Sequence, residues 1–323
     1  MAHTSFGLTI PQRAILFGAS SWPELLELAR AADKNPRFES VWVGDSLTAK
    51  PRPDAIAALG ALTAVTSRLR LGVGCMASFA LRDPLVFALQ WASLDLLSGG
   101  RMQLAVCTGI GLGGTSAREG AIWGVRDSVR GAQMCEKIEI CRRLWCAEDV
   151  SYAGRFHSFE HVTIRPQPVQ QPCPIWIAAN PRPAMAERPL RRIARIADGF
   201  MVAQVWPGLF AELWPRLQAY LRDEGRDLGS FPNIVYMNIN VASDRSRALE
   251  EATRFLREYY GPVFSREMVE AWTAAGAPRE CATDLKRLID AGAQAITLRI
   301  TGWNQQGQFD RIVDEVLPLI DNR

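Results

Sequence analysis

Small and polar residues follow several short β-branched runs, and they are the residues of this chain best suited to chemistry. They occur as Gly44-Asp45-Ser46, as Cys75 to Ser78, as Thr108 to Gly114 and as Asn180-Pro181-Arg182. Glycine lets backbone N–H groups approach a phosphate or a flat ring closely, because no Cβ intervenes. A carboxylate or a hydroxyl can hydrogen-bond a bound ligand or exchange protons with it. These four segments are therefore the candidate parts of one binding site.

One of these segments matches a known phosphate-binding pattern. Gly109-x-Gly111-x-x-Gly114 has the glycine spacing of a dinucleotide fingerprint. In that motif a helix begins directly after the glycines, and an acidic residue follows about 20 positions on. Here the stretch from Thr115 to Ser128 is interrupted by glycines and charges, so we expect no helix to begin promptly. The match favours a loop shaped for another phosphate-bearing cofactor over a dinucleotide site.

The elements that must position these segments form a repeating series. Apolar or β-branched runs alternate with amphipathic stretches, which is typical of βα units around a parallel sheet. The eight predicted strands are residues 6–10, 40–43, 69–75, 102–107, 175–179, 199–203, 234–241 and 295–300. This count predicts an α/β fold of the (β/α)8 or TIM-barrel type, in which active sites lie at the C-terminal ends of the strands. The polar segments would then converge at one end of the barrel.

Two intervals between predicted strands, Met102 to Ile175 and Ile234 to Ala295, are longer than the others, so we expect insertions after strands 4 and 7. The first is predicted to hold a loop at 108–128, a helix at 131–146 and a small hairpin at 150–159 over the barrel. The second is predicted to hold a helix at 245–259 and a cover at 260–278. Long loops of this kind usually serve as lids or binding loops. Without repeats or linkers, residues 1–323 are predicted to form a single domain.

The composition excludes several classes of protein. With 48% hydrophobic and 22% charged residues, the chain is neither disordered nor fibrous. Its net charge of +3 is mixed along the sequence, without the basic patch of a nucleic-acid or lipid-binding protein. No signal peptide or membrane span is apparent, and seven cysteines without a Cys-x-x-Cys pair predict reduced thiols. We therefore expect a cytoplasmic protein whose partners are small molecules or copies of itself.

Longer motifs give the chain a family resemblance. They are Phe38 to Asp45 (FESVWVGD), Arg82-Asp83-Pro84, Ala92 to Arg101 (ASLDLLSGGR), Gly154-Arg155-Phe156, Pro172 to Ala178 (PCPIWIA) and Ala197 to Phe200 (ADGF). In this order, over residues 38 to 300, the chain resembles the bacterial luciferase-like monooxygenase family. The resemblance implies a TIM barrel that binds FMN or the deazaflavin F420 against the ends of the central strands. It also implies a non-prolyl cis peptide at Gly74-Cys75 and a homodimer.

The resemblance, together with position at the strand ends, assigns roles to individual residues. Asp45 and Thr108 are expected to be catalytic, through hydrogen bonds to the ring or the substrate. The expected cofactor-binding residues are Gly74, Cys75, Thr108, Gly109, Ala179, Asn180 and Arg182. The substrate pocket is expected to include Ser46, Met76 and Trp206. No metal site is expected, because His157 and His161 lie four apart in a hairpin without a third ligand nearby.

The sequence departs from the family pattern at two places. F420-dependent members frequently place a histidine after the acidic residue that ends the second strand, and here that position is Ser46. The fifth strand often runs into a Gly-Gly or Gly-Ser pair that holds a phosphate, and here Ala178-Ala179-Asn180 stands in its place. Arg182 either binds the phosphate instead or is an exposed arginine at a helix start. Histidine-based acid chemistry is therefore not expected.

The cofactor prediction follows from charge at the strand ends. F420 carries a lactyl-oligoglutamate tail with several carboxylates, whereas FMN carries one phosphate. Lys50, Arg52 and Arg182 are the cations near strand ends, and each charge-assisted hydrogen bond contributes about 1.5–3 kcal/mol, so this small set favours FMN. The chain is thus predicted to be an oxidoreductase or monooxygenase that uses reduced flavin on a small organic substrate. F420-dependent hydride transfer is the first alternative, and a non-catalytic flavin-binding barrel is the second.

Overall fold

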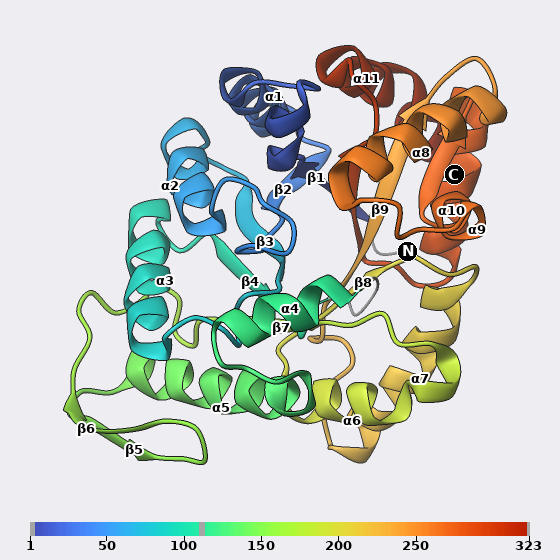
Figure 1. The fold of residues 1–323 in the computed structure, drawn as a ribbon. Coiled ribbons are helices and arrows are strands. Elements are labelled where there is room, and N and C mark those ends of the chain that lie inside the picture. Colours follow the sequence, from blue (N-terminus) through green and yellow to red (C-terminus); the bar gives the residue numbers. More distant parts are fainter. Residues whose placement is uncertain (1–3, 110–113, 322–323) are drawn as a thin grey trace.

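The computed structural model describes residues 4–109 and 114–321 (Figure 1). Its strands are β1 (Ser5–Ile10), β2 (Phe38–Val43), β3 (Arg70–Met76), β4 (Met102–Val106), β5 (Val150–Ala153), β6 (Ser158–Val162), β7 (Ile175–Ala178), β8 (Phe200–Ala203), β9 (Asn233–Val241), β10 (Thr273–Gly276) and β11 (Ala295–Ile300). Its α-helices are α1 (Trp22–Lys34), α2 (Ala55–Val65), α3 (Pro84–Ser98), α4 (Thr115–Ile122), α5 (Asp127–Cys146), α6 (Glu187–Ile196), α7 (Leu209–Asp223), α8 (Arg245–Tyr260), α9 (Arg266–Ala271), α10 (Pro278–Asp290), α11 (Gln305–Arg311) and α12 (Pro318–Asp321). Each of the eight predicted strands is present.

The strands form a closed parallel barrel. The order around it is β9, β11, β1, β2, β3, β4, β7 and β8, and pairing of β8 with β9 closes the ring. Helices surround the barrel on the outside, and Figure 1 looks down on its mouth, where α4, α8 and α9 lie in front. The predicted (β/α)8 architecture is confirmed.

Helix starts follow the sequence signals. Ser21 caps α1 in a capping box, in which the backbone N–H of Ser21 donates to Glu24 (2.7 Å). Asp83 caps α3 by accepting the backbone N–H groups of Leu85 and Val86 (2.9 Å each). Among the described residues, no helix combines the length and the apolar character that a membrane crossing needs.

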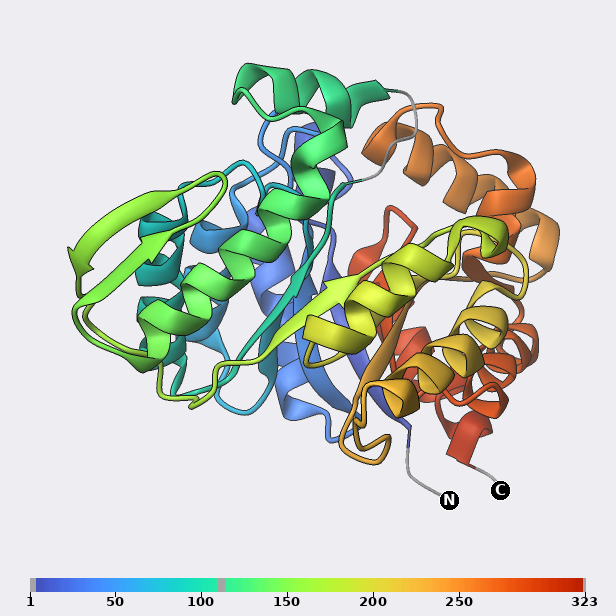
Figure 2. The ribbon, with the colours of Figure 1, turned by 90° about the horizontal axis from the view of Figure 1, so that it is seen from below.

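Both predicted insertions are present, but the hairpin β5–β6 does not cover the barrel. Figure 2 shows it at the periphery, beside α3 and α5. Glu136 on α5 accepts the backbone N–H groups of Arg155 (2.9 Å) and His157 (2.8 Å), which fixes the hairpin turn to the outside of that helix. In the second insertion, the segment predicted as a cover contains α9 and an unpredicted strand, β10, which pairs in parallel with β9.

The glycine-rich segment after β4 also differs from expectation. Helix α4 begins at Thr115, directly after Gly114, whose φ of +65° places it in the left-handed region. Charged and glycine residues within the stretch did not prevent one short helix, in which Arg118 is exposed and Glu119 binds the loop after β2. Residues 110–113, including Gly111 of the fingerprint, lie outside the described residues.

The barrel interior is filled by a cluster separate from the main core between strands and helices. Trp42, Ala105, Trp176, Met201 and Ile234 form it. The two tryptophan rings lie 6.2 Å apart, and each occupies space opened by a glycine. These are Gly72 on β3 for Trp42, and Gly199, directly before β8, for Trp176. This plug closes the barrel below its mouth and forms the base of the site described next.

Candidate active site

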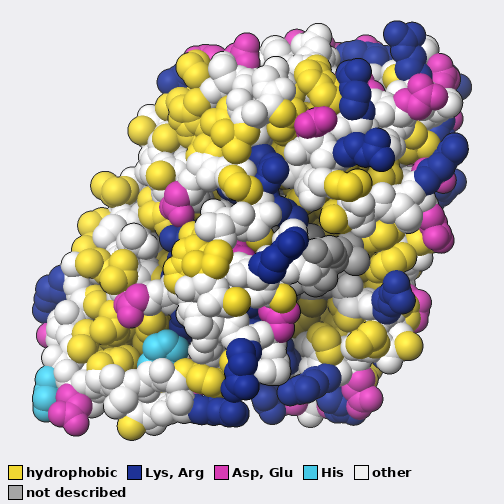
Figure 3. Space-filling view, in the orientation of Figure 1, with side chains coloured by type: hydrophobic (Ala, Val, Ile, Leu, Met, Phe, Trp, Pro, Cys, Tyr) yellow, Lys and Arg dark blue, Asp and Glu magenta, His cyan; other side chains and the backbone are white. Residues whose placement is uncertain are grey.

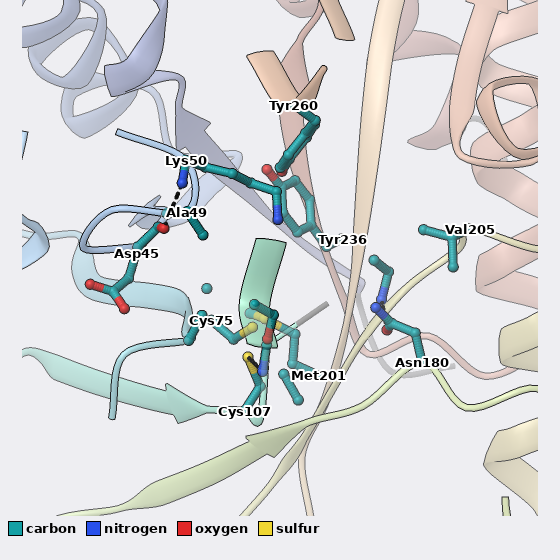
Figure 4. Close-up of a pocket in the computed structure, with 18 of the residues that line it drawn as sticks. Asp45, Ala49, Lys50, Cys75, Cys107, Asn180, Met201, Val205, Tyr236 and Tyr260 are labelled. Atoms are coloured by element: carbon teal, nitrogen blue, oxygen red, sulfur yellow. Dashed lines mark hydrogen bonds between the residues drawn. The ribbon is translucent and has the colours of Figure 1, made fainter. Parts of the chain in front are cut away.

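Two connected cavities open at the C-terminal ends of the strands. The first, called here the inner chamber, has a volume of about 90 Å³ and is lined by Asp45, Ser46, Lys50, Arg52, Gly74, Cys75, Cys107, Glu119, Met201, Tyr236 and Tyr260, among others (Figure 4). The second, called here the outer cleft, has a volume of about 560 Å³ and is lined by Thr108, Ala179, Asn180, Arg182, Arg192 and Trp206, among others. Both share Cys75, Cys107, Gly109, Ala178, Asn180 and Val205. All but one of the residues predicted for the site therefore converge at one mouth.

The residues that separate the two cavities have small, uncharged side chains. The Gly74–Cys75 peptide is cis, as the family resemblance implies, and a Cβ at Gly74 would lie 3.0 Å from Cε of Met201. The neighbouring Cys107 thiol and burial raise the pKa of Cys75 well above its ordinary value, so the Cys75 thiol remains neutral. A flat, largely neutral ring would meet no unpaired charge on this wall.

Asp45 is buried at the end of β2 and bound to the protein. Its Oδ2 accepts the backbone N–H of Ser78 (2.7 Å), and its Oδ1 lies 3.3 Å from Nη2 of Arg82. Burial raises the pKa of Asp45, against the opposing effect of Arg82. In Figure 4 its carboxylate points away from Cys75 and Lys50. The contacts of Asp45 thus fix the turn after β3 relative to the end of β2.

Ser46 belongs to a second polar link, which sequence reasoning missed. Its hydroxyl donates to Oε1 of Glu119 on α4 (3.1 Å), and the backbone N–H groups of Thr48 (2.6 Å) and Ala49 (2.9 Å) donate to the same oxygen. Burial opposes ionisation, but these hydrogen bonds lower the pKa of Glu119. Glu119 therefore anchors α4 to the loop after β2 as a carboxylate.

The loop after β4 is held by another unpredicted residue, Arg130. Its fully buried guanidinium donates to the carbonyl oxygens of Thr108 and Ser116 (3.0 Å each). Gly109, between the two cavities, has a φ of +83°, and a Cβ there would lie 2.9 Å from Oγ of Ser116. Only glycine fits this position without strain. Thr108 itself lines the outer cleft.

The ends of β7 and β8 carry the remaining predicted residues. The Asn180 side chain accepts the backbone N–H of Ala203 (2.7 Å), which ties the two strand ends together. Arg182 is exposed and stacks on Trp206, its guanidinium carbon 4.9 Å from the ring centroid, and both line the outer cleft. Met76 is the exception among the predicted residues, because it packs fully buried in the main core and lines neither cavity. Side chains alternate along a strand, so Cys75 facing inward turns Met76 outward.

Beyond Arg192 and Met185 the outer cleft continues into a groove of about 760 Å³ between α5 and α6. We call it the arginine groove, because Arg188, Arg191, Arg192 and Arg195 line it. Figure 3 shows Lys and Arg side chains gathered along the bottom of the molecule, where α5 and α6 lie in the same view of Figure 1. Of the described residues in the groove, Glu187 pairs with Arg191 (3.1 Å), while Arg188, Arg192 and Arg195 form no ion pair. The count of cations at the strand ends omitted these arginines, because they lie on the helix that follows β7.

A cluster of aromatic and cationic side chains on the other side of the mouth was also missed. Arg299 of β11 is fully buried and donates to Oδ1 of Asn238 (2.9 and 2.7 Å) and to the hydroxyl of Tyr260 (2.6 Å). A lone arginine within the apolar run of residues 295–300 was the available signal in the sequence.

The two histidines among the described residues take no part in the site. His157 contacts Glu136 and His161 contacts Asp149, each through Nδ1 at 2.9 Å, and both lie on the peripheral hairpin. The described residues contain no group of His, Cys, Asp and Glu able to hold a metal ion.

Comparison with known proteins places this geometry in context. The F420-dependent glucose-6-phosphate dehydrogenase of Nakamurella multipartita is 27% identical over 328 residues, covering 94% of this chain and 93% of that protein. A solved F420-dependent secondary alcohol dehydrogenase superposes with a TM-score of 0.81 at 18% identity, covering 99% of both chains. The monooxygenase RslO1 from Streptomyces bottropensis superposes with a TM-score of 0.78 at 21% identity, covering 98% of this chain and 99% of that one. At these identities the two solved structures establish the fold alone.

The sequence pattern of one family extends over almost the entire barrel. It matches residues 4–295, from β1 to the start of β11. The cavities described above lie within that span. The chain therefore belongs to the luciferase-like monooxygenase family.

Proposed function

We propose that this chain is an F420-dependent oxidoreductase that transfers a hydride between the deazaflavin and a small organic substrate. The observation that carries the proposal is the arginine groove, which continues from the barrel mouth and suits the several carboxylates of an F420 tail. FMN carries a single phosphate, so its binding does not require a groove with several arginines. Whole-length relatives whose names state F420 dependence support the same choice. The preference for FMN, which rested on the strand ends, therefore gives way to F420.

The residues present fit such a cofactor. F420 when bound supplies a ring carbon that accepts or releases a hydride. Gly74, Cys75 and Cys107 offer an uncharged wall for its ring, and Gly109 lets the backbone approach closely. Arg182 and Trp206 stand where the cleft leaves the mouth, and the arginines of α6 lie beyond them. Helices α4 and α8 lie in front of the mouth (Figure 1).

Paired titrations of the purified chain with F420 and with FMN test the proposal. We expect F420 to bind more tightly, and its affinity to fall with rising salt, because partly exposed ion pairs are screened. Arg192→Ala and Arg188→Ala should each weaken F420 binding about tenfold, the equivalent of one charge-assisted hydrogen bond, and leave FMN affinity within about twofold. Arg30→Ala, which removes an exposed arginine on α1, is the matched control. Tighter binding of FMN than of F420, or binding of neither, would contradict the proposal.

We also propose a homodimer. Helix α3 exposes four large apolar side chains, namely Val86, Leu89, Leu96 and Leu97 at 54%, 41%, 50% and 71% exposure. In Figure 3 hydrophobic side chains gather on the left, over α2 and α3. A patch of this kind marks an interaction surface, and a second copy with the same patch would cover it symmetrically.

A further inference from the structure

The inner chamber has a cationic wall that hydride transfer does not by itself require. Lys50 and Arg52 line the chamber, and Arg299 lies behind Tyr260. Arg13 does not line the chamber but lies near Arg52, whose charge adds to burial in lowering the pKa of Arg13. We call these four residues the cationic wall.

None of the four forms an ion pair with a described carboxylate. Arg299 donates only to neutral oxygen atoms, those of Asn238 and Tyr260. Nε and Nη1 of Arg13 are buried without a hydrogen-bond partner. Nζ of Lys50 makes no hydrogen bond in the described part of the chain and lies 5.8 Å from the centroid of the Tyr260 ring. Arg299 is fully buried, and Lys50, Arg52 and Arg13 are half-buried. Their described partners are neutral oxygen atoms and aromatic rings. Buried charges are ordinarily paired with an opposite charge, so this cluster leaves an anion unaccounted for.

The carboxylates of the chamber do not supply that anion. Asp45 is bound to Arg82 and to the backbone of Ser78. Glu119 is bound to Ser46 and to two backbone N–H groups of the loop after β2. The negative charge of Glu119 favours the charged form of Lys50, but burial outweighs it and lowers the pKa of Lys50.

The pKa of Tyr260 also indicates a positive potential on this side of the chamber. Burial opposes its ionisation, but Arg299, Arg52 and Lys50 together hold the pKa of its phenol below the ordinary value. Figure 4 shows Lys50, Tyr236 and Tyr260 together on one side of the chamber, opposite Cys75 and Cys107. An oxyanion on this side would meet the Lys50 ammonium and the Tyr260 hydroxyl at once.

We propose that the inner chamber binds an anionic oxygen group of the substrate, a carboxylate or a phosphate, between Lys50, Arg52 and the hydroxyl of Tyr260. Arg299 and Arg13 add positive potential behind them. A volume of about 90 Å³ has room for a group of this size, but not for an oligoglutamate tail. The inference rests on the proposed function in one respect, because it assigns the cofactor tail to the arginine groove and the ring to the wall of Gly74, Cys75 and Cys107. The opposite side of the chamber, at Lys50 and Tyr260, is then left to the substrate.

Calorimetric titration of the cofactor-free chain, with inorganic phosphate and separately with acetate at constant ionic strength, tests the site. We expect saturable binding of at least one of the two, which also tells a phosphate site from a carboxylate site. Lys50→Ala should weaken it about tenfold or more, as the loss of one charge-assisted hydrogen bond predicts, and Lys50→Gln provides a second variant of similar length. Lys34→Ala, at an exposed end of α1, is the matched control. No saturable binding of either anion would overturn the proposal.

An optical readout independent of activity locates the anion. A bound anion disfavours the nearby phenolate, so saturating phosphate or acetate should raise the pKa of Tyr260 in a titration followed by phenolate absorbance. The shift should vanish in Tyr260→Phe. A shift that persists in that variant would place the anion elsewhere.

Titration of the same variants with F420 separates this inference from the proposed function. Lys50→Ala should leave F420 affinity within about twofold. An equal loss of F420 and anion affinity would assign the cationic wall to the cofactor and overturn the substrate site. Failure of the unmodified chain to bind F420, with anion binding intact, would contradict the proposed function alone.

Discussion

Replacement of Gly72 by alanine should destabilise the barrel strongly, because the side chain of Trp42 occupies the space of the missing Cβ. A Cβ at Gly72 would lie 2.7 Å from Cδ2 of Trp42, whereas non-bonded carbon atoms settle at about 3.5–4.0 Å. Cε3 and Cζ3 of the same ring lie closer still, so the indole would have to retreat by more than about 1 Å. It is held by a hydrogen bond from Nε1 to Oγ of Ser40 (2.9 Å) and by the neighbouring Trp176. Overpacking of this kind costs about 1–3 kcal/mol, and we expect the upper end of that range.

Equilibrium unfolding in urea, followed by tryptophan fluorescence, measures this cost. Gly60→Ala is the matched control, since a Cβ there meets only Cδ2 of Leu94 at 3.9 Å within helix α2, and it should stabilise by about 0.5–1 kcal/mol. Trp42→Leu is itself destabilising, but it should relieve part of the Gly72→Ala cost, with a coupling of at least about 1 kcal/mol in the double-mutant cycle. A Gly72→Ala variant within about 0.5 kcal/mol of the unmodified chain, or strict additivity, would refute the packing argument.

Three further predictions concern charge, assembly and local structure. Burial lowers the pKa of Lys137 from 10.5 to about 8. Between pH 8 and 10.5 the unfolded chain therefore binds one more proton than the folded chain, so the free energy of unfolding should rise with pH by up to about 3 kcal/mol. Lys137→Met should abolish that rise in urea unfolding curves. Leu89→Asp or Leu96→Asp should convert a dimer into a monomer in light scattering, and a monomeric unmodified chain would contradict the proposed dimer. Ser21→Ala should lower the free energy of unfolding by about 1 kcal/mol through loss of the α1 cap, while an unchanged value would show that the cap contributes nothing.

The sequence by itself determined the strands and helices of the barrel and much of its mouth. Apolar runs such as Ile234 to Val241, and caps such as Ser21 and Asp83, are local signals, because they depend on side-chain periodicity and on hydrogen bonds within a few residues. In a parallel barrel every strand ends at the same face, so strand-end residues such as Thr108 and Asn180 had to converge there.

Tertiary structure decided which residues from outside the strand ends join the site. Arg192 reaches the cleft from within a helix, and Tyr260 comes from the end of another. Arg299 lies inside β11, which pairs with the neighbouring strand β9. Cys75 rather than Met76 faces inward because pairing sets the register, and a shift of one residue would reverse both. These positions depend on contacts between segments far apart in sequence, and neither composition nor periodicity specifies such contacts.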